Sequence, residues 1–281
     1  MVRRDYAATV ISSGTGRHKQ LLVNGIGMTV LIPVTKVMAH LPLALLPRRP
    51  ESAMVICFGM GTTYRSLMSW DIEVTGIELV PSVRDAFGYY FDDADGILKQ
   101  PNGRIVIDDG RRYLKRTVNR FDVITIDPPP PVEAVGSSLL YSRQFYELLK
   151  TRLQDGGILQ QWFPGGEPRI AAAVARSLRE VFPWVRVFGS TAGWGYHFLA
   201  SEQPLSIPTI NEFVERLPER ARIDLVEWSD QKDHRAYAKE ILSREIPLHL
   251  ILDDSATDSI TDDRPYNEYF LLRRFWARLN R

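Results

Sequence analysis

Apolar runs alternate with amphipathic stretches through the middle of the chain. Short apolar runs predict strands at residues 53–58, 72–78, 104–107, 122–126, 157–163, 185–188 and 196–200. Helices are predicted between them, at residues 64–70, 82–91, 111–118, 142–153 and 168–182. This alternation indicates a doubly wound, mostly parallel sheet that binds ligands at the carboxyl ends of its strands. Only residues 189–195 join the last two strands, too few for a parallel crossover, so these strands are expected to pair antiparallel.

The two flanking regions have other patterns. Residues 5–12, 19–23 and 28–33 alternate as strands do, and the turn sequences SGTG and NGIG separate them. They predict a small antiparallel β element, followed by a helix at residues 35–46 that Pro42 interrupts. Beyond residue 201 the pattern is less regular. A linker and helix are expected at residues 201–217, and further helices at 234–246 and 266–280.

Composition excludes several classes of protein. With 44% hydrophobic and 25% charged residues, the 281-residue chain has the composition of an ordinary globular protein. A net charge of +1 argues against nonspecific nucleic-acid binding. The single cysteine, Cys57, excludes an intrachain disulfide; it is expected to be buried and inert, which fits a cytoplasmic location. His197 has no second His or Cys at a ligand spacing, so no metal site is expected.

Neither a secretory signal nor a membrane span is expected. The first ten residues lack an apolar core of sufficient length for a secretory signal. Residues 28–46 are mostly apolar, but they contain Pro33, Lys36, His40 and Pro42, which a membrane span tolerates poorly. This segment therefore predicts a strand followed by a buried helix.

Residues 52–80 have the order strand, tight turn, helix, strand and carboxylate. Gly59 would let the chain turn sharply, and Gly61 would let the backbone approach a ligand. Glu78 follows Gly59 by 19 residues, at the tip of the second strand, where its carboxylate could accept both hydroxyls of a ribose. Tyr64 replaces the third glycine of the dinucleotide motif. An ordinary strand–helix turn with a solvated glutamate therefore stays as an alternative.

Acids also end later strands of the predicted sheet. Asp108 and Asp109 follow the third strand, and Asp109-Gly110 suits the amino group of an adenine lying against the backbone. The alternative is that one of the two aspartates caps the next helix. Asp127 is followed by prolines at 128–131, whose fixed φ makes a stiff loop. A carboxylate there could orient an amine nucleophile and receive its proton, or it could merely cap a helix.

A parallel sheet completed by an antiparallel strand is the pattern of class I S-adenosylmethionine-dependent transferases. The motifs of this chain resemble one family with that fold, the polyamine aminopropyltransferases (spermidine and spermine synthases), in a divergent bacterial form. The matching blocks are LLVNG (21–25), AHLPL (39–43), GMG (59–61), IELVPSV (77–83), DDGRRYL (108–114), FDVITID (121–127), LLYSRQFYELLKTRLQDGGIL (139–159) and GWGYHFLAS (193–201).

The resemblance implies transfer of an aminopropyl group from decarboxylated S-adenosylmethionine to an amine such as putrescine. It implies that Asp127 is catalytic. It also implies that Glu78 holds the ribose, that Asp109 holds the adenine and that Tyr141 shapes the substrate cleft. With the glycines of the turn and of the third strand end, the candidate nucleoside-binding residues are Gly59, Gly61, Glu78, Asp109 and Gly110. Thr62 and Trp194 are further candidates for the substrate cleft, although Trp194 could instead be a core residue. The resemblance further implies an N-terminal β element with its connecting helix (1–47), a Rossmann-like catalytic domain (48–201) and a helical or irregular extension (202–281). A homodimer and membrane-tethered relatives are left open.

Departures from the family's pattern keep two other functions open. Thr62 and Pro130 stand where the family has aspartates that hold the amine, and Met28 replaces a glutamine. The nucleoside half of the site is thus retained while most amine-binding groups are missing. One alternative is a methyltransferase that uses S-adenosylmethionine, because DPPP (127–130) resembles the loop of amino-group methyltransferases. The other is a catalytically silent nucleoside-binding domain.

Overall fold

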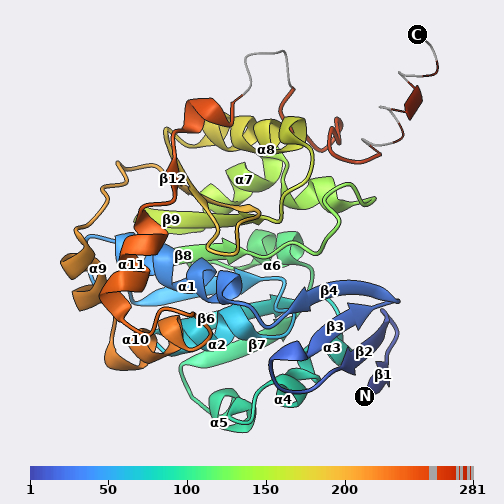
Figure 1. The fold of residues 1–281 in the computed structure, drawn as a ribbon. Helices are drawn as coiled ribbons and strands as arrows, with labels where there is room; N and C mark the ends of the chain where they lie inside the picture. Colours follow the sequence, from blue (N-terminus) through green and yellow to red (C-terminus); the bar gives the residue numbers. More distant parts are fainter. Residues whose placement is uncertain (253–257, 270–271, 273–274, 277–278, 280–281) are drawn as a thin grey trace.

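One central sheet organises the molecule (Figure 1). A computed structural model describes residues 1–252, 258–269, 272, 275–276 and 279, and in this part eight strands form the sheet in the order β12-β10-β11-β9-β8-β5-β6-β7. The strands are β5 (Ser52–Ile56), β6 (Glu73–Glu78), β7 (Gly103–Ile107), β8 (Phe121–Ile126), β9 (Leu153–Phe163), β10 (Trp184–Gly189), β11 (Tyr196–Ser201) and β12 (Glu245–Ile246). Strands β5 to β9 run parallel, and β11 lies antiparallel to both β9 and β10. The predicted fold class and the antiparallel pairing are confirmed.

The central strands are apolar because both faces of the sheet are covered. Every residue of β8 is buried, whereas β7, at the edge of the sheet, has no buried residue. Consecutive residues of β5 alternate between two apolar cores, with Ala53 and Val55 in one and Met54 and Ile56 in the other. The sheet is thus the middle of three layers.

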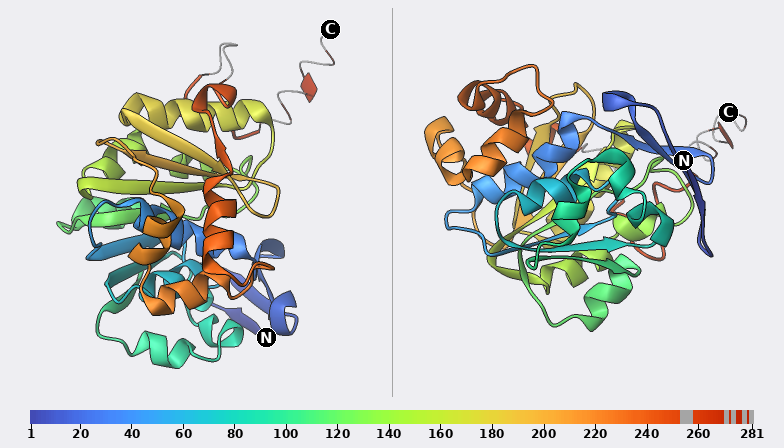
Figure 2. Two further views of the ribbon diagram at one scale, coloured as in Figure 1. Left: turned by 60° about the vertical axis from the view of Figure 1, so that its left-hand side comes forward. Right: turned by 90° about the horizontal axis from the view of Figure 1, so that it is seen from below.

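Helices form the two outer layers (Figure 2). The first core contains residues of α1 (Pro33–Leu45), α2 (Thr62–Met68), α3 (Pro81–Arg84), α4 (Phe87–Tyr90), α5 (Ala94–Leu98), α9 (Ile210–Arg216), α10 (Glu219–Val226) and α11 (His234–Leu242). The second contains residues of α6 (Gly110–Arg116), α7 (Arg143–Lys150) and α8 (Pro168–Val181). Short 3₁₀ turns lie at Gly16–His18, Ser137–Leu140 and Leu248–Leu250. None of the described helices is both long and apolar enough to cross a membrane.

Several helices differ from their predictions. Helix α1 continues through Pro42 to Leu45, because almost all of its residues are buried and this packing outweighs one missing backbone hydrogen bond. The helix predicted at 82–91 is divided into α3 and α4, and α5 and β12 were not predicted. Much of the terminal helix predicted at 266–280 lies outside the described residues.

The N-terminal residues form the predicted antiparallel β element, a separate sheet in the order β1-β2-β3-β4. Its strands are β1 (Val2–Arg4), β2 (Thr9–Ser13), β3 (Gln20–Val23) and β4 (Ile26–Val30). Asn24 and Gly25 join β3 to β4 with φ of 51° and 82°, as a tight hairpin turn requires. This sheet lies beside α3 and α4 (Figure 1), and the Tyr90 hydroxyl is 2.7 Å from Ser12 Oγ. The N-terminal sheet is therefore hydrogen-bonded to the main domain.

A buried charge network joins the C-terminal helices to the rest of the fold. Lys36 Nζ of α1 lies 2.7 Å from both Asp224 Oδ1 and Glu227 Oε2. Arg65 Nη1 of α2 donates to the same two acids at 2.8 Å. His40 Nε2 lies 2.8 Å from Asp224 Oδ2. Asp224 is thus the acid on which α1, α2 and α10 meet.

Candidate functional site

A cavity of about 390 Å³ opens where β5, β6, β7 and β8 end. Its wall is mostly apolar, and four acidic residues line it, Glu78, Asp108, Asp109 and Asp127. The carboxyl ends of parallel strands are where open α/β sheets bind their ligands. The structure therefore brings together the acids that end successive strands.

Glu78 links the first glycine turn to the end of the second strand. Its Oε2 accepts a hydrogen bond from Gly59 N at 3.2 Å, and its Oε1 accepts one from Val80 N at 2.9 Å. Burial raises the pKa of the Glu78 carboxyl, and these N–H donors act against that rise. The carboxylate is thus fixed in the cavity wall by backbone donors.

The two glycines of the turn have different surroundings. Both have positive φ, 57° at Gly59 and 84° at Gly61. Gly59 lines the cavity, and a Cβ on it would have Thr29 Cγ2, at 4.0 Å, as its nearest neighbour. Gly61 is not among the residues that line the cavity, and a Cβ on it would lie 2.5 Å from the Phe87 ring. Gly61 therefore serves packing in this structure, and Gly59 faces the site.

The two adjacent aspartates, Asp108 and Asp109, have different contacts. Asp109 caps α6, because its Oδ1 accepts from Arg112 N at 2.8 Å, yet it also lines the cavity. Its Oδ2 accepts no hydrogen bond from the described residues. Asp108 is buried and ion-paired with Arg112 and with Arg116, the latter at 3.6 Å. Asp109 thus caps helix α6, as the alternative interpretation expected, and it also lines the cavity.

Gly110 allows close packing at the start of α6. A Cβ on Gly110 would lie 2.7 Å from Ile56 Cγ2 at the end of β5. Any larger residue would push α6 away from the strand and move Asp109 with it. Gly110 itself lines the cavity.

Asp127 is the acid without a partner. Its backbone N–H donates to Ile56 O at 3.1 Å, but its carboxylate accepts no hydrogen bond from the described residues. Burial raises the pKa of Asp127 to about 7. The next helical turn of the described chain begins at Ser137, so Asp127 does not cap a helix. Cys57 lies near these acids, and burial followed by the charges of Glu78, Asp127 and Asp109 raises its thiol pKa well above the usual value.

The predicted substrate-cleft residues lie outside the cavity wall. Thr62 is buried in the first turn of α2. Tyr141 is fully buried, and its hydroxyl has no hydrogen-bond partner among the described residues. Trp194 is 47% exposed and packs edge-on against Trp162, with 5.6 Å between ring centroids. Their proposed roles would require the site to extend beyond this cavity.

Part of the wall comes from residues that the sequence patterns did not single out. The β3–β4 hairpin contributes Leu21, Val23, Met28 and Thr29, and Leu139 and Leu140 close another side. The hairpin turn was visible in the sequence, but nothing local indicates which domain its apolar side chains contact. Leu79 and Leu139 are 58% and 43% exposed, so the rim of the cavity is partly apolar.

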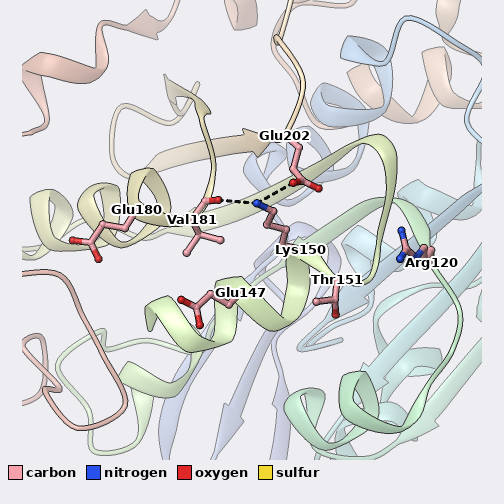
Figure 3. A pocket seen from close by; sticks show the side chains of 7 residues that line it. All are labelled: Arg120, Glu147, Lys150, Thr151, Glu180, Val181 and Glu202. Atoms are coloured by element: carbon pink, nitrogen blue, oxygen red, sulfur yellow. Dashed lines mark hydrogen bonds and ion pairs between the residues drawn. The ribbon is translucent and has the colours of Figure 1, made fainter.

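A second hollow lies at the opposite ends of the parallel strands (Figure 3). There Lys150 Nζ is 2.9 Å from Glu202 Oε1 and 3.3 Å from Val181 O. Arg120 and Thr151 precede β8 and β9, so this hollow lies at the amino ends of those strands. Of its charged side chains, Lys150 and Glu202 pair with each other, while Glu147 and Glu180 pair with Arg143. No cluster of His, Cys, Asp or Glu that could hold a metal was found in the described part of the chain.

The sheet order defines a Rossmann-like α/β domain, and an acid-lined cavity lies at the carboxyl ends of its strands. The profile of the spermine/spermidine synthase domain matches residues 32–191, more than half of the chain. The chain therefore belongs to this family, as its motifs predicted.

Its relatives carry the names of transferases. Polyamine aminopropyltransferase 2 of Pseudomonas aeruginosa is 31% identical over 175 residues, which are 57% of this chain and 49% of the relative. The polyamine aminopropyltransferase of Sulfurisphaera tokodaii is 26% identical over 189 residues, 64% of this chain and 62% of the relative. The chain thus spans less than two thirds of these relatives.

Solved structures share the fold. Spermidine synthase from Thermotoga maritima superposes with a TM-score of 0.67 and 21% identity, covering 90% of this chain and 86% of that one. A spermidine synthase in complex with the transition state analogue AdoDATO gives 0.66 at 20% identity, with the same coverage. Human methyltransferase-like protein 13 in complex with SAH gives 0.54 at 16% identity, covering 70% of this chain and 93% of that one. At these identities the likeness concerns the fold.

Proposed function

We propose that this domain transfers an alkyl group from a sulfonium nucleoside to an amine, with aminopropyl transfer from decarboxylated S-adenosylmethionine as the leading reaction. One observation carries the proposal. An unpartnered carboxylate, Asp127, with a pKa of about 7, lies on the same cavity as Glu78 and Asp109. The family membership and the names of the relatives support it.

The nucleoside would occupy the cavity between the apolar walls. A volume of about 390 Å³ is in the range of small-ligand sites. The fixed Glu78 carboxylate would accept the ribose hydroxyls, and the free Oδ2 of Asp109 would accept from the amino group of adenine. Leu79 and Leu139 would cover the base. That a solved relative binds AdoDATO supports this placement.

Asp127 would act on the amine. An alkylammonium has a pKa of about 10 and cannot attack carbon until it loses a proton. A carboxylate with a pKa near 7 is a stronger base than an ordinary aspartate, so Asp127 would orient the amine and receive its proton. The new C–N bond forms as the C–S bond breaks. The sulfur leaves as a neutral thioether, and no general acid is required.

Two measurements test the proposal. Calorimetry compares decarboxylated S-adenosylmethionine, S-adenosylmethionine and methylthioadenosine, and the decarboxylated form is expected to bind more tightly than the intact one. The Asp127→Asn variant is expected to lose about 10²- to 10⁴-fold in turnover with putrescine. Its nucleoside affinity is expected to change little. Equal turnover in wild type and variant would remove Asp127 from the mechanism.

A methyltransferase is the second candidate. The fold shared with a methyltransferase-like protein that binds SAH favours it. The same calorimetry separates the two, because preference for intact S-adenosylmethionine would support methyl transfer. Absence of binding by all three compounds would support a silent domain.

A further inference from the structure

A second polar group lies past Asp127, beside the end of β9. The Tyr141 side chain is fully buried, and its hydroxyl has no hydrogen-bond partner among the described residues. Its ring packs edge-on against Phe163, with 6.3 Å between centroids. A buried hydroxyl without a partner is unfavourable, because it has lost its hydrogen bonds to water and gained none in the protein. Such a group suits a place where a polar ligand binds.

Glu133 approaches the same strand end from the loop that follows the prolines. Its Oε1 lies 3.5 Å from the position that a Cβ on Gly166 would take, three residues after Phe163. Its side chain is half-buried, and none of the ion pairs in the described chain involves it. Glu133 is thus a second carboxylate without a partner in this part of the molecule.

Register places Asp127 in the same group. In the parallel pairing of β8 with β9, Ile126 is opposite Gln161, so Asp127, directly after β8, lies beside the last two residues of β9, Trp162 and Phe163. After burial and Tyr146, the neighbours that raise the pKa of the Tyr141 phenol are Cys57, Asp127 and Glu133. Tyr141 therefore lies within electrostatic reach of both unpartnered acids.

We infer that Glu133 determines acceptor specificity by binding the far ammonium group of a linear diamine whose near amine is held by Asp127. The Tyr141 hydroxyl would form a hydrogen bond with the near amine of the diamine. The inference rests on the proposed function and deepens it. Taking a dication out of water requires a carboxylate for each charge, and Asp127 supplies only one. Glu133 lies in the loop after Asp127, where Pro130 takes the place of an aspartate found in the family's pattern.

The test measures binding separately from turnover. Calorimetry in the presence of methylthioadenosine compares 1,4-diaminobutane with n-butylamine, which has the same carbon chain and one charge. The Glu133→Gln variant is expected to lose about 10- to 100-fold in affinity for the diamine and to keep its affinity for the monoamine. The control is Glu147→Gln, whose carboxylate is exposed and lies 3.4 Å from Arg143 Nε. The control is expected to match the wild type.

Turnover then separates this inference from the proposed function. With decarboxylated S-adenosylmethionine, Glu133→Gln is expected to raise KM for the diamine while kcat changes less. If wild type binds the diamine but transfers nothing to it, the proposed function fails and the role of Glu133 in binding stands. If wild type does not prefer the diamine, or if Glu133→Gln weakens both amines equally, the inference is overturned. Melting temperatures of all variants exclude unfolding as the cause.

Discussion

Lys36 and Asp224 form a buried ion pair, with 2.7 Å between Lys36 Nζ and Asp224 Oδ1 and side-chain exposures of 0% and 7%. Lys36 belongs to α1 and Asp224 to α10, and the two residues are 188 positions apart in the chain. Ser66 Oγ of α2 also donates to Asp224 at 2.6 Å. Because α2 begins directly after the glycine turn, this pair supports the backbone that carries Gly59.

Replacing Asp224 by Asn should destabilise the protein strongly. Lys36 would lose its buried partner and keep only the more exposed Glu227, so we expect the free energy of unfolding to fall by about 3 kcal/mol. Urea denaturation measures this. The matched control is Asp85→Asn, which breaks an exposed pair with Arg84 at 2.8 Å and should change stability by less than about 1 kcal/mol. Equal losses in both variants would contradict the role of Asp224.

His40 should contribute a loss of stability as pH falls below about 6.5, against which the raised pKa of Asp127 acts. Trp70 Nε1 can only donate, and it lies 2.9 Å from His40 Nδ1, so that nitrogen carries no proton and Nε2–H donates to Asp224. Burial lowers the pKa of His40 below its usual 6.5 despite the Asp224 charge. The unfolded chain therefore takes up a proton that the fold excludes, and each pH unit below 6.5 should remove up to about 1.4 kcal/mol.

The test of this pH dependence is urea denaturation between pH 5.5 and 7.5. His40→Gln should reduce the slope by one proton. Burial also lowers the pKa of His197, to about 3, and raises that of Asp127 to about 7, and these two changes contribute slopes of opposite sign in both proteins. The difference in slope between wild type and variant therefore reports His40. An unchanged slope in His40→Gln would show that His40 is protonated in the fold.

Asp127 should oppose folding at high pH and support activity there. Its folded pKa of about 7 is above the ordinary 3.8, so the fold binds this proton more tightly than the unfolded chain does. Stability is thus lost as pH rises from 3.8 through 7, and Asp127→Asn should be more stable than wild type at pH 8 but not at pH 4. Over the same range kcat/KM of wild type should rise and level off above about pH 7, as the base becomes ionised. A variant with the same relative stability at both pH values would refute the raised pKa.

Alanine at the two turn glycines should have separable effects. Gly61→Ala combines a positive φ with a Cβ 2.5 Å from Phe87, so we expect a loss of about 2–4 kcal/mol in unfolding free energy. Gly59→Ala meets open space and should lose only about 1–2 kcal/mol from its backbone conformation. Its methyl group would project into the cavity and weaken nucleoside binding. Urea denaturation and calorimetry check both, and equal stability of the two variants would contradict the packing role of Gly61.

Local patterns predicted the sheet well because its strands are buried on both faces. The run that contains Val55 is apolar at every position from 53 to 58, and the runs around Ile77 and Ile124 are rich in the β-branched residues Ile, Val and Thr, which favours strands. Strand ends then placed Glu78, Asp109 and Asp127 at one edge, since parallel strands share that edge. The features that the patterns did not predict depend on contacts between residues that are distant in the sequence. Helix α1 passes through Pro42 because of burial, and β12 has only two residues, Glu245 and Ile246.

Side-chain direction is the other property that the sequence patterns did not provide. Gly61 and Thr62 adjoin the turn, but the helix that starts there carries them into the core beside Phe87. Tyr141 lies near Asp127 yet behind the cavity wall. Conversely, Met28 and Thr29 reach the cavity from another sheet. A one-dimensional pattern cannot report such contacts, because it records the order of residues and not which domains their side chains meet.

The β3–β4 hairpin of the N-terminal sheet forms one wall of the cavity through Leu21, Val23, Met28 and Thr29. A nucleoside in the cavity would bridge this hairpin and the acids of the main sheet, so its occupancy and the ordering of the hairpin are thermodynamically linked. Each would strengthen the other. The N-terminal sheet and the main sheet would then act as two halves of one binding surface, on either side of the boundary that we expect near residue 47.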